Sequence, residues 1–120
     1  MIEPSDINRP LLALAALSGA AGVGVLALGV HGSELDTVIG GAFLLIHGVA
    51  LIGISLLPGR LSRIAGYVLF VGVVLFAGDL LLRGQLHQSP LPLLAPAGGL
   101  GLMAGWLLLA TSALVGWRKR

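Results

Sequence analysis

Charged residues divide this chain into four long hydrophobic stretches. The stretches cover about residues 11–30, 37–57, 64–82 and 97–117. A helix needs about 20 mostly apolar residues to cross a hydrocarbon core about 30 Å thick, and each stretch meets that length. Inside them the only acidic, basic or histidine residues are His47 and Asp79. The pattern predicts an all-α integral membrane protein, an antiparallel four-helix bundle in a single domain over residues 1–120.

The composition agrees with this prediction. The chain is 57% hydrophobic and only 10% charged, with a mean hydropathy of +1.03, which is far from the composition of a soluble domain. The first stretch follows Arg9 and contains small residues, as a signal peptide would, but it is longer than a signal-peptide core, so we expect a retained helix. Because the chain has no cysteine, it cannot form a disulfide, a thiolate metal site or a cysteine nucleophile.

The connections between the stretches differ in length. HGSELD and PGRLSR are short, and short connections make neighbouring helices antiparallel partners. The third connection, residues 83–96, is longer and rich in leucine, and it contains Pro90, Pro92 and Pro96. Proline interrupts a continuous helix. We therefore predict an interfacial segment on the non-cytoplasmic side over residues 83–96.

The basic residues predict the orientation. With four spans, one side of the membrane holds the N-terminus, the second connection and the C-terminus. Of the seven basic residues, Arg83 alone falls on the other side, and the remaining six are Arg9, Arg60, Arg63, Arg118, Lys119 and Arg120. Short cytoplasmic segments carry an excess of Lys and Arg. We expect the protein in the inner (plasma) membrane with both termini in the cytoplasm. The basic pI of about 10.0 then reflects residues that orient the chain in the lipid bilayer, and we expect no nucleic-acid partner.

Small residues are abundant inside the stretches. Lipid provides no hydrophobic force between helices, so membrane helices associate where small residues let their backbones approach. Of the 19 glycines, we expect helix packing at Gly22, Gly29, Gly78, Gly98, Gly99, Gly101 and Gly105.

Asp79 is the unusual residue of the third stretch. A rise of 1.5 Å per residue places it close to the non-cytoplasmic end of its span, at the level of His31, and Arg83 follows at the i+4 position. We predict a polar cluster of His31, Asp79 and Arg83 on that side, with Gly98 and Gly99 beside it. Three roles remain open for Asp79: fixing helix packing, relaying protons or ions through His31, and contacting another subunit.

His47 lies near the middle of the membrane. A single imidazole there is typically hydrogen-bonded to a neighbour, although a haem or pigment site on His47 alone remains an alternative. His31 and His47 differ too much in depth to bind one haem together. Since the sequence shows no nucleophile motif, phosphate loop or paired carboxylates, we expect no catalytic, cofactor-binding or metal-binding residues, no cofactor and no enzyme activity.

Four segments resemble one small family of membrane proteins. They are ALGVHGS, LIHGVAL (which places His47 on a family histidine), VLFAGDLLL and APAGGLGLMAGWLLLA. The family is domain-of-unknown-function 423, small four-span proteins with bacterial members and a eukaryotic transmembrane relative, and the resemblance covers about residues 11–117. It implies an inner-membrane protein without an established biochemical activity. Asp79 and Leu81 stand where this family usually has serine and tyrosine, so a chemistry common to the family cannot depend on an aspartate there.

Two classes of function follow from these observations. We favour an accessory or stabilising subunit that packs against a larger membrane protein complex. The alternative is a stand-alone transporter or proton or ion relay that uses His31, His47 and Asp79. Transporters usually have broken helices and several polar groups near the midplane, whereas here only His47 lies at that depth.

Overall fold

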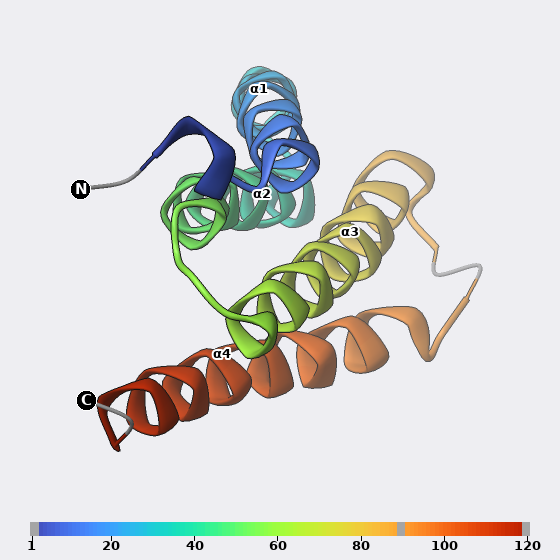
Figure 1. Cartoon of the computed structure of the whole chain (residues 1–120). Coiled ribbons are helices and arrows are strands. Elements are labelled where there is room, and N and C mark those ends of the chain that lie inside the picture. The colour runs from blue at the N-terminus through green and yellow to red at the C-terminus, as the bar shows by residue number, and fades with distance from the viewer. Residues whose placement is uncertain (1–2, 89–90, 119–120) are drawn as a thin grey trace.

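Four long helices make up most of the chain. The computed structural model describes residues 3–88 and 91–118. A short 3₁₀ helix, η1 (Pro4–Asp6), precedes α1 (Arg9–His31), α2 (Leu35–Ser55), α3 (Arg60–Leu86) and α4 (Leu94–Arg118), and the described residues include no strand (Figure 1). All four helices are long and apolar enough to cross a membrane. The predicted all-α fold with four membrane helices is confirmed.

Local chemistry sets where the helices begin. The side chain of Asn8 caps α1, because its Oδ1 accepts a hydrogen bond from the backbone N–H of Leu11 at 3.2 Å. Pro10 follows in the first turn, where a helix does not need its missing N–H. α3 begins after Gly59, whose φ of 96° lies in the left-handed region that glycine adopts without strain.

The third connection is shorter than the predicted segment over residues 83–96. α3 continues to Leu86, and α4 already begins at Leu94. The end of α3 stays helical because it packs on α2, where Gln85 Nε2 donates to Thr37 Oγ1 at 3.2 Å. Pro96 does not delay α4, since it occupies the first turn. Pro90 lies outside the described residues.

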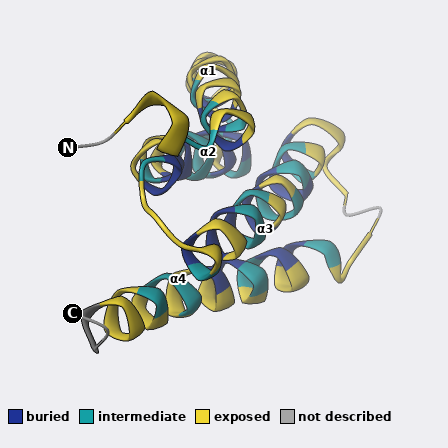
Figure 2. Cartoon of the chain, viewed as in Figure 1, coloured by how far each residue is buried: buried dark blue, intermediate teal, exposed yellow. Residues whose placement is uncertain are grey.

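The helices form two antiparallel hairpins. α1 packs along α2 and α3 packs along α4, while α2 and α3 join the two hairpins. Among the described residues, no Cα of α1 comes within 8 Å of a Cα of α4. The bundle is therefore open, with α1 and α4 on its flanks and broad exposed faces on both (Figure 2). Leucine and valine side chains of all four helices fill the core, namely Leu11, Leu51, Leu69, Val73 and Leu102.

Glycines make the closest helix contacts. A Cβ at Gly22 would lie 2.6 Å from the backbone nitrogen of Leu45, and Gly29, Gly98 and Gly105 approach neighbouring helices as closely. Gly101 is in ordinary contact with α3, and Gly99 meets only the ring of Phe76 at 3.9 Å. The prediction for Gly78 does not hold, because a Cβ there would meet nothing within 4 Å. Gly78 lies on a side of α3 that no neighbouring helix of the described chain approaches.

Candidate functional site

His47 occupies the middle of α2 and contacts α4 through its ring. Its Nδ1 lies 2.9 Å from the backbone oxygen of Phe43, one turn earlier on the same helix. Trp106 Nε1 donates a hydrogen bond to His47 Nε2 at 3.2 Å, from α4 to α2. Phe43 stacks on the imidazole with ring centroids 5.8 Å apart. These contacts leave His47 buried, although the outer face of Trp106 is exposed.

The two hydrogen bonds assign the tautomer of His47. An indole N–H can only donate, so Nε2 must accept and carries no proton. Nδ1 then carries the proton and donates it to the carbonyl of Phe43. Since both ring nitrogens are bonded inside the chain, a haem or pigment metal at Nε2 would first have to displace Trp106. Within the described residues there is also no group of three His, Asp or Glu side chains that could hold a metal ion.

Asp79 and Arg83 form an ion pair on α3. Arg83 Nε lies 2.9 Å from Asp79 Oδ2, the contact that their i,i+4 spacing predicts. The aspartate side chain is fully buried, whereas about a third of the arginine side chain (36%) remains exposed. Neither carboxylate oxygen has a hydrogen bond in the described structure, and neither has Arg83 Nε, so the arginine compensates this carboxylate as the opposite charge of an ion pair.

The packing of α3 against α4 puts Asp79 at the level of the first turn of α4. Gly105 packs on Leu69, Gly72 on Leu102, and Gly98 on Phe76. Continuing this antiparallel register by one turn brings Asp79 level with Ala95, which is buried in the first turn of α4. The N-terminus of a helix carries a partial positive charge from its free N–H groups. The buried carboxylate therefore lies at the level of the positive end of α4, on a helix whose next turn carries Arg83.

The structure does not join His31 to this pair. The ring nitrogen Nδ1 of His31 is 2.8 Å from the backbone oxygen of Ala27, and the side chain is exposed on α1. No hydrogen bond or ion pair between His31 and Asp79 is present in the described part of the chain. The three residues of the relay alternative, His31, His47 and Asp79, thus belong to three separate sets of contacts.

Three further hydrogen bonds connect the helices at the two ends of the bundle. On the N-terminal side, Tyr67 donates to Asn8 Oδ1 at 3.3 Å, and the backbone N–H of Asn8 donates to Ser55 at 2.9 Å. On the opposite side, Thr37 accepts from Gln85 at 3.2 Å. Sequence reasoning missed all of these contacts and the pairing of Trp106 with His47. The one available signal was depth, since His47 and Trp106 both lie near the middle of their spans.

Comparisons with known proteins agree with this architecture. The family model described as "Protein of unknown function (DUF423)" matches residues 18–99. The UPF0382 membrane protein of Staphylococcus haemolyticus is 33% identical, covering 82% of this chain and 90% of the relative. The UPF0382 membrane protein YwdK of Bacillus subtilis is 28% identical, covering 88% of this chain and 97% of the relative. No solved structure matches the chain.

Proposed function

This chain belongs to the DUF423 family and is a multi-pass membrane protein, and we propose that it acts as an accessory subunit that packs against a larger membrane protein. The observation that carries the proposal is the internal use of its intramembrane polar groups. His47 is bonded to Phe43 and Trp106, and Asp79 is paired with Arg83. A carrier or channel needs such groups to face its substrate. Here His47 links α2 to α4 and Asp79 is paired within α3. Both groups are therefore engaged inside the chain, and the surfaces left for function are the outer faces of the helices.

The outer face of α1 is the surface on which we test the proposal. It is opposite the face that packs on α2, and its small residues are Ala13, Ala16, Ala20, Gly24 and Ala27, which recur at intervals of three and four. A Cβ at Gly24 would meet nothing within 4 Å. Small residues let two membrane helices approach closely, and in this chain no described helix occupies that face.

The experiment compares two substitutions at one position. Gly24→Leu should remove a co-purifying membrane protein in mild detergent, because the larger side chain keeps a partner helix away. Gly24→Ala should retain that protein, and both variants should fold, since the space beside Gly24 is open. Because the chain has no cysteine, Ala20→Cys can also be cross-linked to whatever lies against α1, with Met103→Cys on the exposed face of α4 as the control.

Three results would contradict the proposal. The first is purification of the wild type without any partner, and the second is equal cross-linking from Ala20→Cys and Met103→Cys. The third is an ion or proton flux in vesicles that contain only this protein and that is lost in Asp79→Asn. The last result would favour the relay alternative, provided that the variant remains folded at the temperature of the flux measurement.

A further inference from the structure

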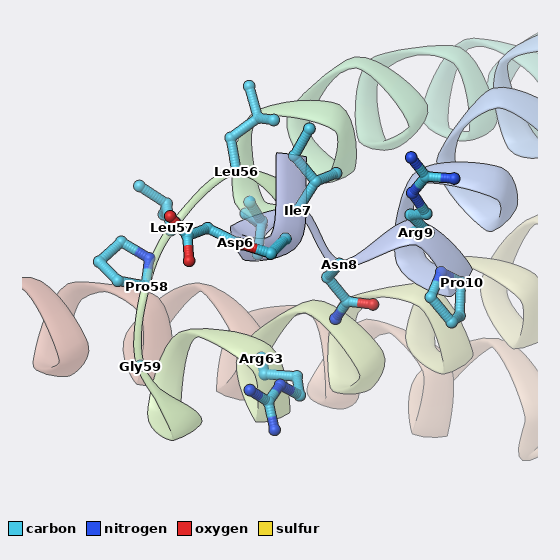
Figure 3. Close-up of a pocket in the computed structure, with 12 residues that line it drawn as sticks. Asp6, Ile7, Asn8, Arg9, Pro10, Leu56, Leu57, Pro58, Gly59 and Arg63 are labelled. Carbon is cyan, nitrogen blue, oxygen red and sulfur yellow. The ribbon is translucent and has the colours of Figure 1, made fainter. Parts of the chain in front are cut away.

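A cavity of about 670 Å³ lies where the N-terminal segment meets the turn between α2 and α3 (Figure 3). Residues 5–10 form one wall, and residues 56–59 with Ile54 and Arg63 form the other. Both walls stand at helix ends on the side of the molecule that carries the N-terminus. In a membrane-spanning chain this level is the lipid–water interface, where phospholipid headgroups lie.

One wall residue of the cavity, Asn8, carries a buried hydrogen-bond donor without a partner in the described structure. The Nδ2 atom of Asn8 is buried and has no hydrogen-bond partner in the described structure, while Oδ1 of the same amide is used by Leu11 and Tyr67. In Figure 3 the Asn8 side chain points toward the start of α3, where Arg63 lies. A buried amide N–H without an acceptor is destabilising, and an oxygen of a bound ligand would supply the missing acceptor.

The cavity is also electropositive. Arg9 and Arg63 line it, and neither makes a salt bridge in the described part of the chain. The one acidic residue in the lining, Asp6, accepts a hydrogen bond from the backbone N–H of Glu3 at 3.2 Å and so is engaged within its own turn. α1 and α3 begin beside the cavity and α2 ends there, so the positive ends of two helices border it together with the negative end of one.

The remaining walls are apolar. Ile7, Leu56, Leu57 and Pro58 surround the polar groups, so the cavity offers hydrocarbon contact directly beside cationic donors. Basic pockets between membrane helices bind anionic lipid headgroups in this way. We propose that this cavity binds a phosphate group through Arg63 and Asn8 Nδ2, with Arg9 adding positive charge on the other side of Asn8 and with the phosphate of an anionic phospholipid as the source. The site is independent of any partner on the outer face of α1.

The test uses the purified full chain in a neutral detergent. Phosphatidylglycerol, phosphatidylcholine and inorganic phosphate are added separately, and the unfolding midpoint and the bound mass by native mass spectrometry are measured. Phosphatidylglycerol should raise the midpoint and remain bound as one molecule, whereas phosphatidylcholine should do neither. If inorganic phosphate reproduces the whole shift, the phosphate site stands and its source is the free anion. If neither phosphatidylglycerol nor phosphate binds, the proposal is wrong.

Matched variants separate this site from general charge attraction. Arg63→Gln should weaken phosphatidylglycerol binding about tenfold, as expected for the loss of one charge-assisted hydrogen bond. Arg60→Gln removes the same charge three residues away, outside the cavity lining, and should leave binding unchanged. Asn8→Asp keeps the oxygen that caps α1 but replaces the free donor with a negative charge, so it should weaken binding in a folded protein. Equal losses in Arg63→Gln and Arg60→Gln would overturn the proposal.

Discussion

His47 and Trp106 show how a polar side chain is accommodated inside a membrane helix. An imidazole without partners in hydrocarbon would cost several kcal/mol, but here both ring nitrogens are bonded. The bond to Trp106 also connects α2 with α4, two helices that have no Cα atoms within 8 Å of each other in the described residues. These two side chains therefore supply a direct link between the hairpins, in addition to the packing of α2 on α3.

We predict that His47 and Trp106 are energetically coupled. Trp106→Phe removes the indole donor and keeps a ring, and His47→Phe removes the acceptor. A double-mutant cycle on unfolding in detergent should give a coupling of about 0.6–1.7 kcal/mol, the range for hydrogen bonds between membrane helices. Trp106→Tyr is the control for ring packing. It moves the hydrogen-bond donor away from the indole position while losing less buried ring area than Trp106→Phe. Additive effects of the two phenylalanine variants would show that the contact contributes no stability.

Asp79 gives a second prediction at the scale of single residues. Asp79→Leu should lower the free energy of unfolding by about 1–3 kcal/mol, because it leaves Arg83 without its carboxylate. Asp79→Asn should lower the free energy of unfolding by less, since the amide keeps the size and polarity of the side chain. The double variant Asp79→Leu/Arg83→Leu should recover much of the loss, because it removes both charges together. A double variant as unstable as the two single losses combined would show that the residues act independently.

At the scale of helices, glycines on the same pair of helices differ in what they contact. A Cβ at Gly98 would lie within 2.9 Å of the backbone of Phe76, whereas one at Gly78 would meet only open space. We predict that Gly98→Ala lowers stability by about 1–3 kcal/mol through overpacking. Gly78→Ala should raise it by about 0.5–1 kcal/mol through helix propensity. Thermal unfolding in detergent measures the stability of both variants. If Gly98→Ala and Gly78→Ala changed stability equally, α3 and α4 would pack through other faces.

Hydrophobic length predicted the four helices, because a span is specified by composition over about 20 residues. The rotation of each helix about its axis was not predictable in the same way. Gly78 and Gly98 both follow the small-residue pattern, yet only Gly98 faces a neighbour. The pairing of His47 with Trp106 and the separation of His31 from Asp79 depend on the same rotations. The Asp79–Arg83 contact could be anticipated because it is local, with both residues on one helix.

At the scale of the molecule, two hairpins are held together at three levels. Asn8 joins the start of α1 to α2 and α3 on the N-terminal side, and Thr37 bonds to Gln85 at the other end. His47 and Trp106 connect the middle. This arrangement keeps the hairpins in register without a contact between α1 and α4 in the described residues. It also leaves the outer faces of those two helices to lipid or to another protein.

The basic residues predict the orientation of the whole molecule in the membrane. Six of the seven basic residues belong to the side that holds the N-terminus and the α2–α3 turn, and Arg83 is the exception. We predict that this side is cytoplasmic. In the cysteine-free chain, Ser5→Cys should react with a membrane-impermeant maleimide only after the cells are opened, whereas Gln88→Cys should react in spheroplasts. The two positions lie at opposite ends of the helices, so each serves as the control for the other. If Ser5→Cys is labelled in intact spheroplasts and Gln88→Cys is protected, the orientation is the opposite of the predicted one. Most basic residues would then lie on the outer side, against the charge rule on which the prediction rests.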